Sequence, residues 1–239
     1  MKIKLSLAIA LMIFFSMARS QEITLDEILA RYANAMGMEK LQGVSTMIMD
    51  GTLIQQDAMP VKIVRMRPDR YLMEFDIQDI TASQGYDGQT AWWTTPWAGN
   101  PGPQLMPEER ARDLKSRADF DGILAGWKTK GHLVELVGRD TVEKAPAYRL
   151  KITRRDGGIE YLFIDAETFL VHKRLTYRKA RGQDVAVENY FRDYRPVEGI
   201  LFAFTQDTFL GGQPYNSLQF DSIRLNAPVE AAVFGMPVK

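Results

Sequence analysis

The sequence predicts a mainly β protein with flanking helices, in which a long antiparallel sheet forms most of the chain. Apolar and polar side chains alternate with a period of two residues through a dozen short segments. In RYLMEFDI (70–77), for example, Tyr71, Met73 and Phe75 share one face, as in a half-buried strand. Turn residues such as Asp-Gly and Gly-Gly separate the segments, and sequence with helical spacing interrupts the series only once.

Residues 1–20 have the features of a secretory leader. Lys2 and Lys4 precede an apolar run at 5–17, and Ala18-Arg19-Ser20 places small residues at both recognition positions of a signal-peptidase site. We expect cleavage before Gln21 and export. A retained membrane anchor is the alternative, but the run is shorter than the roughly 20 residues that a spanning helix needs. Residues 21–239 contain no linker or repeat, so we expect a single domain.

Composition excludes several classes of protein. The sequence has no cysteine, so disulfides, thiolate catalysis and lipid attachment to an N-terminal cysteine are excluded. The chain has 30 basic and 30 acidic residues, and loss of the leader would remove three basic residues and no acidic one, leaving a net charge of −3. The sequence therefore lacks the basic excess of nucleic-acid-binding proteins.

An amphipathic helix is predicted at the start of the mature chain. Thr24 and Glu27 form a capping-box pattern, and Gly37 is a natural stop. Apolar residues recur between them at helical spacing, which indicates one face packed against the rest of the domain.

Twelve strands are then predicted from the alternation and the turns. They fall near residues 43–54, 58–67, 70–77, 80–87, 90–95, 132–139, 146–155, 159–165, 169–179, 184–194, 200–209 and 214–225. Two packed sheets would bury their apolar faces against each other, whereas one long curved sheet would need helices to fill its concave side.

The interruption lies between the fifth and sixth predicted strands. Residues 97–107 are rich in proline and glycine, and a polar helix is predicted from Pro107 to about Ala118. Four apolar residues then follow at helical spacing around glycines and form a candidate movable flap, or lid. They are Phe120, Ile123, Leu124 and Trp127. The alternative is a fixed turn packed over the end of the sheet.

Three motifs point to a known family. RPDRY at 67–71, YDGQTAW at 86–92 followed by Pro96, and VFGMP at 233–237 occur in this order. Together they resemble the motifs of the LolA/LolB-like periplasmic lipoprotein carriers, and the similarity in the order of elements spans residues 22–239. Two features depart from the best-known carrier. It has tryptophan where this chain has Met73, and the insert at 97–131 looks closer to a broader set of outer-membrane lipoprotein-sorting-like proteins than to that carrier.

The resemblance implies a fold and a function. It implies an incomplete antiparallel β-barrel of about 11–12 strands, which encloses a hydrophobic cavity under a helical lid. The implied function is periplasmic transport of lipoprotein acyl chains, or of related lipids, towards the outer membrane. An inner-membrane donor complex and an outer-membrane acceptor are the implied partners, and the carrier is expected to be a monomer without a cofactor. The alternative function is a sensor that binds lipid or peptide and regulates a membrane partner.

Arg67 matches the family arginine that holds the lid shut. A guanidinium has five donors in a fixed fork, so it can bind several free carbonyls at a helix end and release them when cargo displaces the lid. The alternative is a surface arginine at a strand end.

Aromatic and methionine side chains on the predicted strands are candidates for the cavity lining, because rings and thioethers suit a disordered apolar guest. The alternative is an ordinary filled core. The candidates are Tyr71, Met73, Phe75, Trp92, Phe163, Phe202 and Phe204.

The sequence offers little for catalysis. His132 and His172, the only histidines, fall on different predicted strands, so no metal site is predicted. No nucleophile elbow or phosphate-binding loop is present. We therefore expect a protein that is not an enzyme.

Overall fold

The computed structural model describes residues 23–77, 80–98, 100–180 and 182–237. The predicted leader at 1–20 and its cleavage site lie outside these residues.

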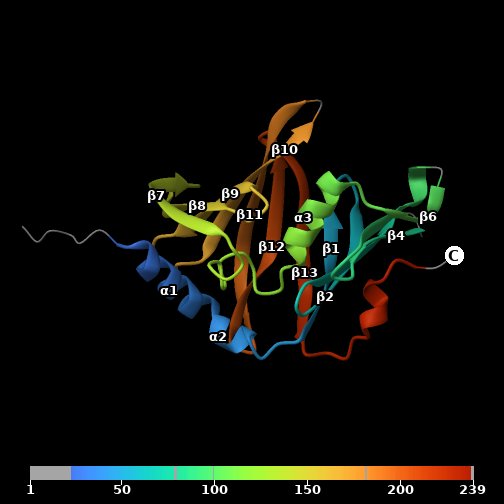
Figure 1. The fold of residues 1–239 in the computed structure, drawn as a ribbon, viewed down its shortest axis with the longest axis horizontal. Coiled ribbons are helices and arrows are strands. Elements are labelled where there is room, and N and C mark those ends of the chain that lie inside the picture. The colour runs from blue at the N-terminus through green and yellow to red at the C-terminus, as the bar shows by residue number, and fades with distance from the viewer. Residues whose placement is uncertain (1–22, 78–79, 99, 181, 238–239) are drawn as a thin grey trace, which may run out of the picture.

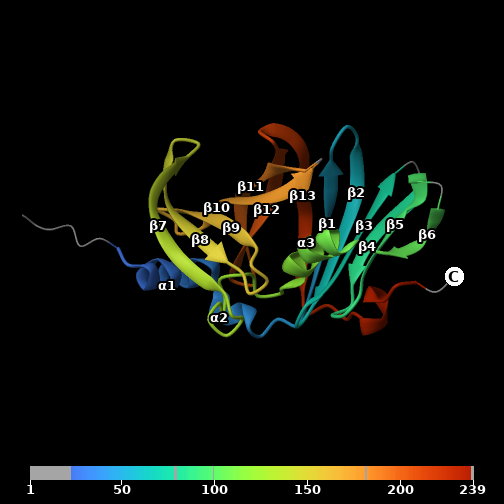
Figure 2. The same cartoon turned by 45° about the horizontal axis from the view of Figure 1, so that its top comes forward.

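Within the described residues, thirteen strands form one antiparallel sheet that remains open. The order runs from β6 down to β1 and then from β13 down to β7, so the first strand pairs with the last. The edge strands β6 and β7 lie at opposite sides of the molecule (Figures 1 and 2). This open sheet with few helices confirms the predicted class of fold. The strands are β1 (Thr46–Ile54), β2 (Ala58–Met66), β3 (Arg70–Ile77), β4 (Ile80–Tyr86), β5 (Ala91–Thr95), β6 (Asn100–Leu105), β7 (Leu133–Val142), β8 (Ala145–Thr153), β9 (Ile159–Asp165), β10 (Val171–Ala180), β11 (Gln183–Val197), β12 (Ile200–Leu210) and β13 (Gln213–Leu225).

The sequence-based strand count was low by one, because β6 lies in the proline-rich segment that the alternation did not mark as a strand. It pairs only with β5 and forms an edge of the sheet. Prolines are tolerated at a sheet edge, where a missing N–H costs no ladder bond.

Helices cover part of the sheet. The helical elements are α1 (Leu25–Met36), α2 (Met38–Leu41), η1 (Pro96–Ala98), α3 (Glu108–Ala118) and η2 (Ala231–Phe234). The Thr24 hydroxyl accepts a hydrogen bond from the Glu27 backbone N–H at 3.2 Å, as predicted, and Gly37 ends α1 with a φ of 72°. The Glu27 carboxylate pairs with Arg31.

Both long helices pack against the same face of the sheet, which we call the inner face. Leu162 lies directly opposite Arg174 in the β9–β10 ladder, so the two side chains share a face. Leu162 belongs to the apolar cluster around α1, and Arg174 reaches Ser116 of α3. The helices therefore fill one side of the curved sheet, with α3 near its middle and α1 near β7–β9 (Figure 2).

The C-terminal segment covers part of the outer face. Phe234 is fully buried in a cluster with Trp92, Val64 and Leu72, and the Trp92 indole donates a hydrogen bond to the Phe234 carbonyl at 2.7 Å. Gly85 lies opposite Trp92, and a Cβ there would come within 2.4 Å of the indole. The family-like end of the chain thus closes the outer face of β1–β5.

We expect Phe234→Ala to destabilise the fold by about 3–5 kcal/mol, because it empties a fully buried site. Val233→Ala, at a position that is 45% exposed, should change the free energy of unfolding by less than about 0.5 kcal/mol. Urea denaturation of both variants measures the difference. Equal small effects would show that the C-terminal segment does not contribute to the core.

Candidate functional site

Five of the predicted lining residues come together on the inner face. They belong to one apolar cluster, which also contains Ala111, Leu114 and Ala118 of α3. We call this set of side chains the inner cluster. The five residues are Tyr71, Met73, Phe75, Phe202 and Phe204.

Trp92 and Phe163 belong elsewhere, so including them in the lining was wrong. Trp92 packs under the C-terminal segment on the outer face. Phe163 clusters with Val142 and Ala147, on the face of β9 opposite to Leu162. The next residue, Trp93, lies opposite Gln84, which itself lies opposite Met73, so Trp93 is the indole that faces inward. Both faces of β5 are apolar, and the sequence does not show which one turns inward.

The predicted lid residues divide between two clusters. Phe120 is 2% exposed in the inner cluster, whereas Leu124 is buried with α1 and β7–β9, where Ile123 and Trp127 also pack. The segment that carries them, residues 119–131, consists of turns and contains no α-helix. It therefore bridges the two halves of the inner face, while α3 supplies the helical cover.

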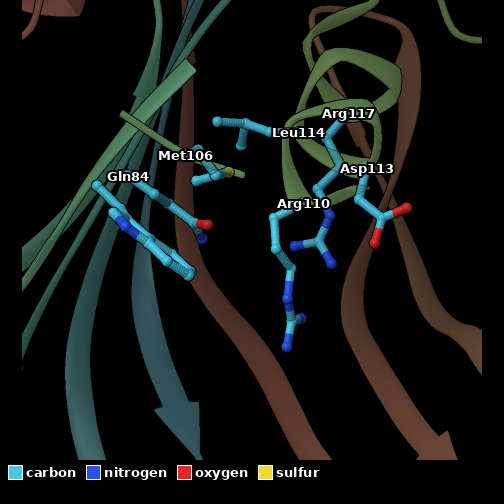
Figure 3. A pocket seen from close by; sticks show the side chains of 7 residues that line it. Gln84, Met106, Arg110, Asp113, Leu114 and Arg117 are labelled. Carbon is cyan, nitrogen blue, oxygen red and sulfur yellow. The ribbon is translucent and has the colours of Figure 1, made fainter. Parts of the chain in front are cut away.

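Helix α3 packs closely over part of the inner face. A pocket of about 90 Å³ lies between α3 and strands β4 and β5, lined by Leu114, Met106 and Trp93 and by polar residues including Gln84 (Figure 3). Sites for drug-sized ligands measure about 300–1,000 Å³. At this place α3 leaves less space than such a ligand occupies.

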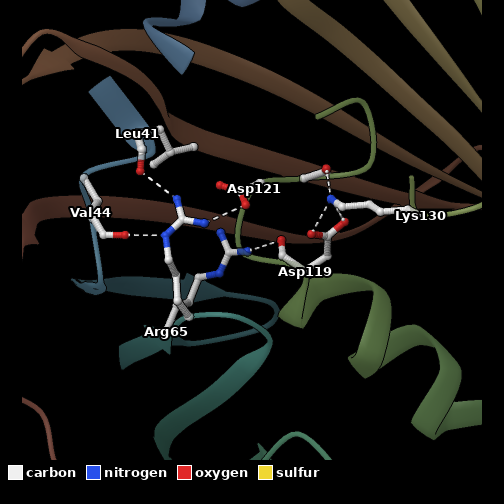
Figure 4. Close-up of polar contacts among 8 residues, drawn as sticks. Leu41, Val44, Arg65, Asp119, Asp121 and Lys130 are labelled. Atoms are coloured by element: carbon white, nitrogen blue, oxygen red, sulfur yellow. Dashed lines mark hydrogen bonds and ion pairs between the residues drawn. The ribbon is translucent and has the colours of Figure 1, made fainter. Parts of the chain in front are cut away.

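Arg67 binds two backbone carbonyls and one carboxylate. Its guanidinium donates to the carbonyls of Leu41 at 2.7 Å and Val44 at 2.6 Å, and it pairs with the Asp121 carboxylate at 2.6 Å (Figure 4). It also lies 4.7 Å from the centre of the Phe120 ring. Because Leu41 is the last residue of α2, one side chain connects a helix end, the sheet and the 119–131 segment.

Arg65 was missed by the sequence analysis. It donates to the carbonyls of Asp119 at 2.6 Å and Arg117 at 3.1 Å, two groups left free at the end of α3. It precedes Arg67 by two residues in the chain, and this spacing alone places both guanidinium groups on one face. Lys130 then binds the Asp119 carboxylate at 2.7 Å. We call Arg65, Arg67, Asp119, Asp121 and Lys130 the clasp.

Burial changes the electrostatics of this region. It lowers the pKa of the Arg65 guanidinium, an effect that Tyr71, Asp119 and Asp121 oppose. Burial also raises the pKa of the Tyr71 hydroxyl, although Arg117 and Arg65 lie nearby. Tyr71 is buried and Arg65 is half-buried, and hydrogen bonds in such places are stronger than at the surface.

A second set of polar contacts joins α3 to strands β9 and β10. Glu160 is 1% exposed on the inner face and pairs with Arg174, which donates to the Ser116 hydroxyl of α3 at 3.3 Å. Arg154 approaches the other carboxylate oxygen of Glu160 at 3.8 Å, and this oxygen accepts no hydrogen bond from the part of the chain that the structure describes.

A larger hollow of about 470 Å³ lies on the outer face of β1–β4 and β13. Its lining includes the carboxylates of Asp50, Glu74, Asp76 and Asp221 and the ammonium group of Lys62. Because charged groups dominate it, this hollow does not suit a hydrocarbon chain.

The histidines stand apart. His132 accepts a hydrogen bond from the Arg155 backbone N–H at 3.2 Å, and His172 contacts Glu143 at 3.1 Å. Among the described residues no group of three or more potential ligands is arranged to hold a metal ion. In the same part of the chain no helix has the length and apolar character needed to cross a bilayer.

Solved structures share this architecture. A DUF1329 family protein from Desulfovibrio piger matches with a TM-score of 0.61 at 13% identity, over 87% of this chain and 97% of that chain. A LolA superfamily protein from Nitrosomonas europaea matches with a TM-score of 0.58 at 13% identity, over 89% and 98% of the two chains. The fold is LolA-like. A domain described as outer membrane lipoprotein-sorting, from Vibrio parahaemolyticus, matches this LolA-like chain with a TM-score of 0.57 at 13% identity, over 85% and 95%. No family model and no curated protein sequence matches the chain.

We expect Arg174→Met to destabilise this LolA-like domain by about 3 kcal/mol, because it leaves the Glu160 carboxylate buried with only Arg154 nearby. Adding Glu160→Leu should recover more than half of the loss, since the buried charge is then gone. Arg178, on the same strand, forms no ion pair among the described residues, and Arg178→Met should cost less than about 1 kcal/mol. Chemical denaturation of the variants measures these values, and equal costs for Arg174→Met and Arg178→Met would contradict the buried pair.

Proposed function

We propose that this protein is a periplasmic carrier that shields the acyl chains of lipoproteins, or of related lipids, on the way to the outer membrane. The observation that carries the proposal is the inner cluster, an apolar face of an open sheet that is covered by one short helix and a segment of turns. The LolA-like fold supports the same proposal. In it, Tyr71, Met73, Phe75, Phe202 and Phe204 contact the guest.

Replacement of α3 by a guest is energetically plausible. The helix buries only two alanines and one leucine completely, so displacing it exposes little apolar surface. Each methylene group of an acyl chain gains about 0.8 kcal/mol on leaving water. A few buried methylenes therefore compensate for the loss of α3 from the inner cluster.

The clasp lets α3 leave the inner face and return to it reversibly. Its hydrogen bonds and ion pairs join the sheet to the ends of α2 and α3, and such polar contacts can exchange for water when the helix moves. In this proposal Arg67 is the latch, Arg65 caps α3 in the closed state, and Phe120 is the part of the lid that leaves the inner cluster.

The direct test is native mass spectrometry of the protein purified from the periplasm of its own host. We expect a lipid or an acylated protein to copurify and to move to acceptor vesicles when they are added. A guest that stays bound while affinity for a membrane protein changes would favour the sensor function. Turnover of the guest would instead show an enzyme, and an empty protein that takes up no lipid would refute the carrier proposal.

Arg67→Leu should increase the rates at which a fluorescent lipid is loaded and released, by about tenfold, because the variant loses two hydrogen bonds and an ion pair of the closed state. Stopped-flow transfer between donor and acceptor vesicles measures both rates. Lys130→Met opens the clasp at another point and provides a second variant if Arg67→Leu folds poorly.

Arg31→Leu is the matched control. Arg31 pairs only with Glu27 among the ion pairs of the described residues, and it lies on the exposed side of α1. Its substitution should leave both rates unchanged. Loading and release that are also unchanged in Arg67→Leu and Lys130→Met would exclude a latch at the clasp.

A further inference from the structure

The pocket beside α3 changes from apolar to cationic along its depth. Leu114 and Met106, which are 2% and 9% exposed, form its buried part, whereas Arg110 and Arg117 are exposed at its rim. The two arginines are seven residues apart, so they lie on the same side of α3 as Leu114. Figure 3 shows both guanidinium groups extending from the helix beside this apolar floor.

The charges of these two arginines are only partly neutralised by the protein. Among the described residues neither Arg110 nor Arg117 forms an ion pair, while Glu108 engages the two cations on another side of the same helix. Those cations are Arg112 at 3.6 Å and Lys115 at 4.0 Å. Asp113 also lines the pocket and offsets one of the two charges. The rim therefore keeps a net positive charge.

We infer that the guest is an amphiphile with an anionic headgroup, which Arg110 and Arg117 bind at the rim. Its chain enters between Leu114 and Trp93 as α3 moves away from the sheet and the small pocket widens. This inference rests on the proposed carrier function. Guanidinium groups bind carboxylate and phosphate oxygens through paired, charge-assisted hydrogen bonds, so either headgroup fits. Gln84, on the opposite wall, offers an amide to the same headgroup.

The test compares amphiphiles with the same chain and different headgroups. Dodecanoate, dodecyl phosphate and dodecanol each displace N-phenyl-1-naphthylamine, a neutral apolar fluorophore, from the purified protein. We expect the two anions to bind about tenfold more tightly than the alcohol. This preference should fall to within about twofold in the double variant Arg110→Gln/Arg117→Gln.

Arg112→Gln/Lys115→Gln is the matched control, because it removes two positive charges from the same helix on the side paired with Glu108. It should keep the tenfold preference. Melting temperatures identify any variant that folds poorly, and single substitutions of the exposed arginines then replace the double variant.

The outcomes separate the two proposals. If the alcohol and the anions bind wild-type protein equally well, the headgroup site is wrong and the carrier proposal stands. A preference that survives in Arg110→Gln/Arg117→Gln, or that is lost equally in the control, also overturns the site. Competition by inorganic phosphate or acetate alone as strong as by the amphiphiles would show a site for free anions and overturn the headgroup. If no amphiphile displaces the fluorophore, both proposals fail.

Discussion

Protection of the inner face from water is the constraint on which the rest of this structure depends. A sheet that closes into a barrel fills its own interior, but here the edge strands β6 and β7 do not pair, so other elements must cover the apolar side chains. Helix α1 covers β7–β9, and α3 with residues 119–131 covers the inner cluster. The fold is thus complete only when these segments are in place.

The two covers differ in strength. Helix α1 is capped at both ends and packs a long apolar stripe against β7–β9, with Ile28 fully buried. Helix α3 contributes two alanines and a leucine to the inner cluster, and polar contacts from Arg65 and Arg174 hold it. A cover that depends on exchangeable hydrogen bonds more than on apolar area can leave its site at low cost. In the proposed carrier, α3 is therefore the part of the cover that gives way to a guest.

In this proposal the polar groups of α3 contribute to both the closed state and the guest-bound state. Its C-terminal carbonyls are satisfied by Arg65 when the helix is seated, and its arginines at the rim of the pocket offer charge to a headgroup. In this proposal one short helix therefore both covers the inner face and binds the headgroup. These two roles account for its high charge over an apolar face.

The sequence by itself determined twelve of the thirteen strands, the limits of α1, the helix after Pro107 and the resemblance that implied an open barrel. Period-two alternation, capping residues and turn residues involve only residues that are close together in the sequence. They therefore specify these elements without reference to the rest of the fold. The same alternation placed Tyr71, Met73 and Phe75 on one face. It predicted their common environment correctly.

Only the tertiary structure decided which face of each strand turns inward and which side chains pack against that face. Trp92 and Trp93 are adjacent and equally apolar, and Trp92 faces outward because Phe234, far along the chain, packs against it. The pairing of β6, the turns of residues 119–131 and the capping of α3 by Arg65 likewise depend on partners that are distant in sequence. Local chemistry fixes the period of a strand, but contacts between remote segments fix its orientation and determine how much space remains beneath a helix.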